Sequence, residues 1–223
     1  MRIIDPSFTW LGNAPDGDQM LANIAAAGRV CYQSEGKSDD ATFVRKRIRQ
    51  GHESILEHEK ISVRIICDRG VSHELVRHRI ASYSQESTRY CNYSKGKFGS
   101  ELTFIRPYWD DGSHSAEMVK LRICWKFACI DAETHYKDMM ELGCTPEAAR
   151  AVLPNCLKTE VVMTANLREW RHFFKLRCAP AAHPDMRIVA NMLLTAFKDV
   201  VPVVFDDIEG WTECFELIPM EDE

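Results

Sequence analysis

The nine-residue segment KISVRIICD, from Lys60 to Asp68, constrains the fold of this chain more than any other stretch. Its apolar residues Ile61, Val63, Ile65 and Cys67 recur at every second position, so an extended chain would place them on one face. This period of two is typical of a strand that buries one face. The fold must therefore contain a sheet.

Helical patterns and capping residues lie on both sides of this strand. Asp16 or Asp18 can cap a helix that reaches Ala27 and stops at Gly28, and Asn166 can cap a helix that starts at Leu167. We predict further helices over 38–51, 70–77, 113–142, from 145, and over 184–200, further strands over 102–105 and 160–164, and loop or extended chain over 80–93. Interleaved helices and strands predict a mixed α/β (α+β) fold, with a central sheet flanked by helices in a single domain spanning residues 1–223.

Composition excludes several classes of protein. The formal net charge of −5 argues against a general nucleic-acid binder, which usually has a basic face. The apolar runs are too short to span a bilayer, so we expect no membrane contact. Nine cysteines, an odd number without a Cys-x-x-Cys pair, fit neither a disulfide framework nor a zinc ribbon. With no signal-peptide pattern at the N-terminus, we expect a cytoplasmic protein with reduced thiols.

The segment RHRIASYSQESTRY, from Arg77 to Tyr90, is the most informative for function. It contains three arginines and several hydroxyl side chains but one carboxylate. Guanidinium groups bind phosphate through paired, charge-assisted hydrogen bonds, which serine hydroxyls can complement. If Ser87 to Arg89 is extended, these two side chains share a face and can grip one phosphate. Cations at a helix C-terminus would explain Arg77 to Arg79 alone, but the added Ser87-x-Arg89 favours anion binding.

A second basic segment, NLREWRHFFKLR, runs from Asn166 to Arg177. Arg168 and His172 are four residues apart and share one helix face. On its own this segment would be an amphipathic helix with solvated basic residues.

Histidine spacing does not predict a metal site. His73-Glu74 and His78 resemble a metalloprotease motif, but the two histidines are five residues apart instead of four and would not share a ligating face. His52-Glu53 with His58 has the wrong spacing as well. We therefore expect no metal.

The pattern RHR-x7-S-x-R, formed by Arg77 to Arg79 and Ser87 to Arg89, resembles the signature of the flavin-dependent thymidylate synthases. The resemblance extends from about residue 29 to residue 200 and includes these further matches in the expected order: His52-Glu53-Ser54, Glu57-His58, Ala149-Arg150, Leu153-Pro154, Asn166-Leu167-Arg168 and Leu176-Arg177. Many members have Gln-Trp-Glu after the last arginine, whereas this chain reads Ala182-His183-Pro184-Asp185. Position 172 is asparagine in some relatives and histidine here.

The resemblance implies a fold of the thymidylate synthase-complementing protein type and a homotetramer with active sites shared between subunits. It implies methylation of dUMP to dTMP, with 5,10-methylenetetrahydrofolate as carbon donor and NADPH as reductant through FAD. Matching positions imply FAD contacts from Ser54, Arg77, His78, Arg79, Gln85, Asn166, Arg168 and His172. They imply dUMP contacts from Glu74, Arg77, Gln85, Glu86, Ser87, Arg89, Arg150 and Arg177, with His52 on the flavin and folate side.

By the same resemblance, the reaction needs no protein nucleophile, and Arg177 is the candidate catalytic residue because its guanidinium can stabilise charge on the pyrimidine. Cys91 and Cys178 are the thiols nearest the motifs, and we expect neither to be catalytic. The other seven cysteines are expected in the core. The alternatives are a non-catalytic nucleotide-binding or regulatory protein and an RNA-binding module, which the acidic charge balance disfavours.

Overall fold

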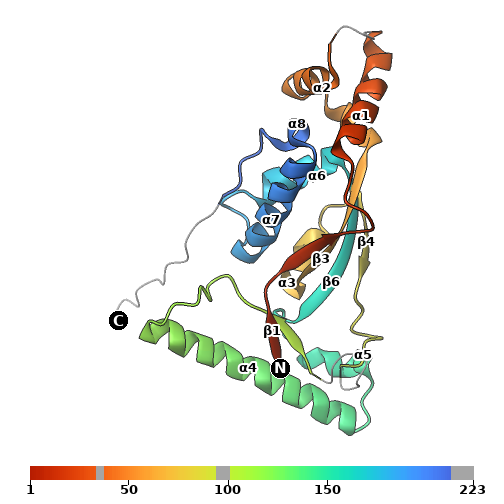
Figure 1. Ribbon diagram of the computed structural model, residues 1–223. Helices are drawn as coiled ribbons and strands as arrows, with labels where there is room; N and C mark the ends of the chain where they lie inside the picture. The colour runs from red at the N-terminus through yellow and green to blue at the C-terminus, as the bar shows by residue number, and fades with distance from the viewer. Residues whose placement is uncertain (34–37, 94–100, 212–223) are drawn as a thin grey trace.

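The computed structural model describes residues 1–33, 38–93 and 101–211. Its main sheet has four antiparallel strands in the spatial order β2–β3–β6–β4 (Figure 1). The strands are β2 (Ser7–Trp10), β3 (Lys60–Asp68), β4 (Ala81–Gln85) and β6 (Lys158–Asn166). The predicted mixed class of helices and strands is confirmed, and β6 extends two residues beyond each end of the predicted strand.

The alternating residues of β3 form the buried face of this sheet. Ile61, Val63, Ile65 and Cys67 are at most 1% exposed, as the period of two predicts. Helices α6 (Leu167–Arg177) and α7 (Pro184–Val200) contribute to the same core, and their buried aromatic side chains are Trp170, Phe173, Phe174 and Phe197. Burying one large apolar side chain of this kind contributes about 1.5–3 kcal/mol, so these two helices are firmly attached to the sheet.

Four shorter or peripheral helices complete this core: α1 (Gly17–Tyr32), α2 (Asp40–Arg49), η1 (Glu53–His58) and α8 (Pro202–Phe205). Helix α1 begins after Asp16, whose carboxylate accepts a hydrogen bond from the Gln19 N–H, so one of the two predicted caps is confirmed. None of the helices among the described residues is both long and apolar enough to cross a bilayer.

The predicted helix stop at Gly28 is wrong. Helix α1 continues through this residue to Tyr32, and Gly28 is buried. A Cβ atom at this position would lie 2.7 Å from Cε1 of Phe43 on α2. The glycine therefore allows two helices to pack closely, a tertiary role that a local pattern cannot distinguish from a helix end.

A second, smaller core lies around a long helix at one end of the molecule (Figure 1). Its elements are β1 (Arg2–Ile4), β5 (Thr103–Ile105), which pairs with β1 in parallel, α4 (Ala116–Glu141), α5 (Pro146–Ala149) and η3 (Arg150–Val152). The predicted long helix is confirmed, because α4 starts at the Ser115 cap and Gly143 follows its end with φ +89°.

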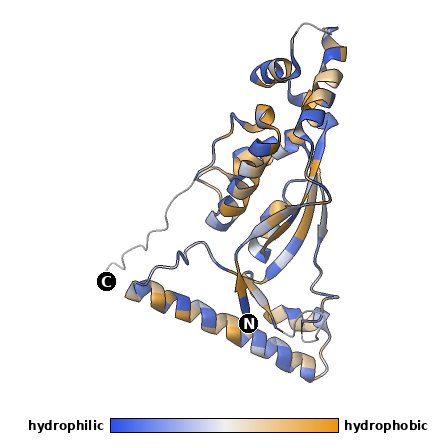
Figure 2. Cartoon of the chain, in the orientation of Figure 1, coloured by the Kyte–Doolittle hydropathy of each residue, from blue (hydrophilic) through white to orange (hydrophobic). Residues whose placement is uncertain are grey.

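Helix α4 leaves apolar side chains uncovered. Ile123, Phe127 and Ile130 are 48%, 61% and 42% exposed and follow the i, i+4, i+7 spacing of one helix face. Figure 2 shows apolar and polar residues mixed along the whole length of α4. We call the surface of these three residues the α4 apolar face.

Candidate active site

Two helices that leave the central strand pair bring the functional residues together. Helix α3 (Arg69–Leu75) follows β3 directly, and α6 follows β6 directly. Asp68 and Asn166 end these strands and cap the helices by accepting hydrogen bonds from Val71 N–H (2.7 Å) and Glu169 N–H (2.9 Å). Because β3 and β6 are antiparallel, the two helices start at opposite ends of the pair, and their C-terminal residues meet.

The Arg-His-Arg sequence lies in the turn after α3. The Tyr83 hydroxyl holds this turn, 2.7 Å from the carbonyl oxygen of Leu75 and 2.8 Å from that of His78. His78 is buried at 4% exposure, whereas Arg77 and Arg79 are exposed. The turn therefore presents two guanidinium groups to solvent and directs the imidazole inward.

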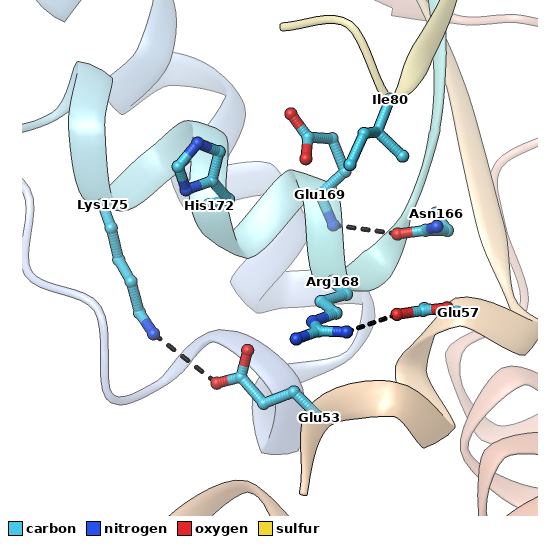
Figure 3. A pocket seen from close by; sticks show the side chains of 8 residues that line it. All are labelled: Glu53, Glu57, Ile80, Asn166, Arg168, Glu169, His172 and Lys175. Carbon is cyan, nitrogen blue, oxygen red and sulfur yellow. Dashed lines mark hydrogen bonds and ion pairs between the residues drawn. The ribbon is translucent and has the colours of Figure 1, made fainter. Parts of the chain in front are cut away.

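Two adjoining pockets open along this turn and helix α6. The arginine pocket has a volume of about 540 Å³, and its lining residues are Glu74, Arg77, His78, Arg79, Ile80, Glu169, His172, Leu176 and Arg177. The α6 pocket has a volume of about 550 Å³, and its lining residues are Glu53, Glu57, Ile80, Asn166, Arg168, Glu169, His172 and Lys175 (Figure 3). Since Ile80, Glu169 and His172 line both, the two pockets adjoin, and we treat them together as one continuous hollow.

The α6 pocket confirms that Arg168 and His172 share a helix face, because both line it. Arg168 Nη1 is 2.5 Å from a carboxylate oxygen of Glu57, and Lys175 Nζ is 3.5 Å from one of Glu53 (Figure 3). These cations lie in partly exposed ion pairs, whose net contribution to stability is about 0–1 kcal/mol. They can exchange their carboxylate partners for an anionic ligand at little cost.

A buried hydrogen-bond network lines the arginine pocket. His78 Nδ1 is 3.1 Å from Glu169 Oε1, and Arg177 Nε donates to His78 Nε2 at 3.1 Å. Arg177 Nη1 donates to Glu74 Oε2 at 2.7 Å, and Nη2 donates to the Glu74 carbonyl at 3.2 Å. Burial lowers the pKa of His78; the nearby Arg177 charge adds to this, while Glu169 opposes it. His78 is therefore neutral at pH 7.

His78, Glu169 and His172 are also close enough to bind a metal ion, since one ligand atom from each lies within 4.8 Å of the others. The Arg177 guanidinium argues against this use. It is permanently charged and donates to Nε2 of His78, while the other ring nitrogen contacts Glu169. The cluster fits a hydrogen-bond network better than a cation site.

A separate pocket surrounds Arg150, a predicted dUMP ligand. This Arg150 pocket has a volume of about 290 Å³, and its lining residues are Arg69, His73, Thr88, Arg150, Ala151, Leu153, Pro154 and Asn155. Among the described residues, none of its lining side chains is a carboxylate, and neither arginine has an ion-pair partner. Arg150 Nη1 donates to Thr88 Oγ1 at 3.3 Å. Two uncompensated guanidinium groups make this pocket suitable for an anion.

Arg69 and His73 are residues that the sequence interpretation missed. They are four apart on α3, so they share the helix face that points at Arg150. The same spacing argument that grouped Arg168 with His172 could have identified them.

The condition that Ser87 to Arg89 is extended, on which the shared grip of one phosphate depends, is not met. The Ser87 carbonyl accepts hydrogen bonds from the N–H groups of Tyr90 (3.2 Å) and Cys91 (3.0 Å), which is the pattern of a helical turn. Arg89 N–H donates to Ser87 Oγ at 3.3 Å, and Arg89 Nε forms an exposed ion pair with Glu147 at 2.9 Å. The argument that Ser87 and Arg89 share a face therefore does not hold, although Thr88 in the same turn reaches the Arg150 pocket.

Gln85 and Glu86 have partners inside the chain. Gln85 Nε2 donates to Ser72 Oγ at 2.9 Å and to Thr159 Oγ1 at 3.2 Å. Glu86 accepts from the Tyr93 hydroxyl at 2.8 Å and from Lys158 Nζ at 2.9 Å. Neither side chain lines the arginine pocket or the α6 pocket, so their ligand contacts stay predictions.

His52 and Ser54 lie at the start of η1 and are exposed. The His52 ring stacks on Tyr32 with an interplanar angle of 9°, and His52 Nδ1 is 2.6 Å from the Tyr32 hydroxyl. Neither residue lines the α6 pocket, but Glu53 between them does.

The cysteines differ partly from expectation. Cys178 is buried, and burial raises its pKa to about 12, so its thiol is not a nucleophile near neutral pH. The expected core placement is wrong for Cys31 and Cys124, which are exposed on helices, and Cys214 lies outside the described residues.

A further cavity of about 220 Å³ shares one lining residue with each of the two candidate binding regions. It includes Glu74 of the arginine pocket, Asn155 of the Arg150 pocket, and the side chains of His183 and Asp185. Of the predicted dUMP ligands, Glu74, Arg77 and Arg177 line the arginine pocket and Arg150 lines the Arg150 pocket, with helix α3 between the two. The other four, Gln85, Glu86, Ser87 and Arg89, line neither pocket.

Comparisons with known proteins agree with these observations. The family profile described as "Thymidylate synthase complementing protein" matches residues 16–203. A flavin-dependent thymidylate synthase of Geobacter sulfurreducens is 37% identical over 209 residues, which are 88% of this chain and 84% of the relative. One of Mycolicibacterium gilvum is 36% identical over 219 residues, which are 92% of this chain and 84% of the relative.

Among solved structures, the UMP/dUMP methylase PolB of Streptomyces cacaoi, bound with 5-Br dUMP, has the same fold with a TM-score of 0.76. It is 22% identical, and the match covers 92% of this chain and 96% of PolB. The profile and the relatives together confirm the resemblance seen in the Arg-His-Arg signature: the chain belongs to the thymidylate synthase complementing proteins, the family of the flavin-dependent thymidylate synthases.

Proposed function

We propose that the protein methylates dUMP to dTMP, taking the carbon unit from 5,10-methylenetetrahydrofolate and the reducing equivalents from NADPH through FAD. The observation that supports this most is the convergence of Arg77, Arg79 and Arg177 around the buried imidazole of His78 in one pocket. Permanently charged groups gathered at one hollow suit a ligand with several phosphates and an ionisable base.

The continuous hollow fits FAD. Each of its two pockets, of about 540 and 550 Å³, is in the size range of small-molecule sites. The hollow has a cationic end at Arg77 and Arg79 and a second pair of cations at Arg168 and Lys175. We assign the FAD pyrophosphate to these cations and the remaining polar contacts to Asn166, His172 and the nearby Ser54. Bound FAD supplies the hydride for the reduction. The residues of this chain bind it, orient it and exclude water.

Arg177 is the candidate catalytic residue. A guanidinium has five N–H groups, and three of those of Arg177 are used by His78 and Glu74. Two N–H groups remain for a ligand in the arginine pocket. They can stabilise negative charge as it builds on the pyrimidine carbonyl and nitrogen, which makes C5 of the base nucleophilic.

The Arg150 pocket suits the phosphate of dUMP. Arg150 and Arg69 provide uncompensated charge, and the turn from Ser87 to Arg89 adds donors next to Thr88. The PolB structure with bound 5-Br dUMP supports a pyrimidine nucleotide as the ligand of this fold.

A homotetramer with shared active sites would reunite these residues. In one chain the predicted dUMP ligands Arg177 and Arg150 line separate pockets on either side of α3, and the α4 apolar face is uncovered. An uncovered apolar helix face is a feature of surfaces that associate. We propose that subunits pack through this face and complete the site, with His52 on the folate side. We also propose that the protein is cytoplasmic and has no nucleic-acid or membrane partners.

The test is dTMP formation from dUMP by purified protein. We expect turnover that requires FAD, 5,10-methylenetetrahydrofolate and NADPH together, and a visible flavin absorbance spectrum of the purified protein. A protein that binds dUMP but forms no dTMP under these conditions would instead be the non-catalytic nucleotide-binding protein that the sequence left open.

A further inference from the structure

Glu169 is a buried carboxylate at the boundary of the arginine and α6 pockets. It is 7% exposed and lines both pockets. Among the described residues its ion-pair contact is with His78, at 3.1 Å, and not with a lysine or arginine. Burying a carboxylate costs several kcal/mol unless good partners compensate. On a helix face that also contains the buried Phe173, an apolar residue would cost less free energy than a carboxylate, so Glu169 needs another explanation.

The proton positions in this network follow from donor and acceptor rules. An arginine only donates, so the Arg177 Nε–H bond to His78 Nε2 requires that nitrogen to be the acceptor. A neutral imidazole then has its proton on Nδ1. Nδ1 faces Glu169 Oε1, which can only accept while it is ionised. The contacts of Arg177 and Glu169 therefore select the same tautomer of His78.

The network also fixes the direction of the Arg177 guanidinium. His78 holds Nε, and Glu74 holds one N–H of each terminal nitrogen. With three donors held on the protein side, one N–H group of each terminal nitrogen remains for a ligand. Without a fixed His78 ring, Nε loses its acceptor and the guanidinium keeps only its contacts to the partly exposed Glu74.

We propose that Glu169 is a positioning residue that locks His78 in the Nδ1–H tautomer, so that His78 holds Arg177 toward the arginine pocket. The relay runs from the Glu169 carboxylate through the His78 ring to the guanidinium. The expected effect of this relay on turnover rests on the proposed function, whereas the expected tautomer of His78 does not depend on that function.

The tautomer is measured first, by nitrogen-15 NMR of histidine-labelled protein with the His78 signals assigned by their loss in His78→Gln. We expect neutral His78 with its proton on Nδ1 at pH 7.5. A proton on Nε2 would overturn the proposal even if dTMP synthesis is confirmed. This measurement needs no substrate, so it also decides the proposal if dTMP synthesis fails.

Kinetics then test the effect on Arg177. Glu169→Gln keeps an acceptor oxygen, so we expect kcat for dTMP formation within about threefold of wild type. Glu169→Leu removes the acceptor and should lower kcat roughly tenfold to hundredfold, while the Kd of dUMP changes less than about threefold. Equal losses for the Gln and Leu variants, or a loss in dUMP affinity alone, would overturn the relay.

Two further variants separate positioning from general damage. In an Arg177→Ala background, Glu169→Leu should cause no additional loss in the rate of the methylation step, because the guanidinium that the relay positions is absent. A full additional loss would contradict the proposal. Glu133→Gln is the matched control, since it alters a buried carboxylate of the second core, paired with Lys137. It should leave kcat and the His78 tautomer unchanged. If Glu169→Leu does not fold, the wild-type tautomer and Glu169→Gln still decide the proposal.

Discussion

Replacing Arg69 by methionine should weaken dUMP binding without destabilising the protein. Arg69 is the first residue of α3, where the positive end of the helix dipole disfavours a cation. Among the described residues, the Arg69 side chain donates a long hydrogen bond of 3.3 Å to Thr159 Oγ1, which also accepts from Gln85. Methionine keeps the apolar stem. We therefore expect the free energy of unfolding to change by less than about 0.5 kcal/mol.

The loss in binding follows from the charge in the Arg150 pocket. A hydrogen bond between charged groups contributes about 1.5–3 kcal/mol, which corresponds to roughly tenfold to hundredfold in Kd. Arg69 is half-buried and Arg150 is exposed, so solvent screens Arg69 less. Arg69→Met should therefore weaken dUMP binding at least as much as Arg150→Met.

Calorimetric titration with dUMP and with deoxyuridine, at one salt concentration, measures this effect. Deoxyuridine has no phosphate, so both variants should bind it like the wild type. Arg64→Met is the control, because Arg64 is a half-exposed arginine on β3 paired with Glu160 and outside the pocket. An equal loss for the two ligands, or unchanged dUMP affinity in Arg69→Met, would refute the assignment of the phosphate.

Further predictions concern the rest of the molecule. Cys91→Ala with Cys178→Ala should retain dTMP synthesis within a few-fold, and a loss of several orders of magnitude with flavin still bound would establish a thiol mechanism. Arg79→Ala should weaken FAD more than dUMP in separate titrations, and the opposite order would reverse the assignment. Phe127→Asp should reduce both the oligomer mass by light scattering and the bound flavin, since the site is proposed to need a second subunit. Burial raises the pKa of Asp185 from 3.8 to about 6. The protonated carboxyl therefore stabilises the folded state at low pH, and this stability is lost as pH rises through about 6. The melting temperature of Asp185→Asn should exceed that of the wild type at pH 8 and match it at pH 4.

Local features of the fold could be predicted from the sequence because their causes are local. The alternation of β3 and the caps at Asn166 and Asp16 depend on neighbours within four residues, and the structure has them as predicted. A glycine at this place in a helical pattern predicts a helix end, but the role of Gly28 is set by its close packing against Phe43 on another helix. Nothing within the sequence window around Gly28 contains that information.

In the candidate site, too, local patterns could be predicted from the sequence and long-range contacts could not. The signature predicts that Arg77 to Arg79 act at one place, and they do line one pocket. It contains no information on Glu169, whose contact with His78 joins residues 91 positions apart. The wider resemblance treats Arg150 as a ligand of the same nucleotide as Arg177, although one chain places the two in different pockets.

The register of the central strands decides whether the site exists. Nine residue pairs join β3 and β6, from Lys60 opposite Asn166 to Asp68 opposite Lys158. A slip of one residue would turn the buried face of either strand outward, so the alternation of apolar residues excludes it. A slip of two keeps the faces but moves one strand by about 7 Å along the other. Helix α6 would move with β6, and Arg177 could then reach neither His78 nor Glu74, since these contacts need 3.1 and 2.7 Å. The apolar pattern therefore restricts the register to even shifts, and the caps that start α3 and α6 where the strands end select one of them.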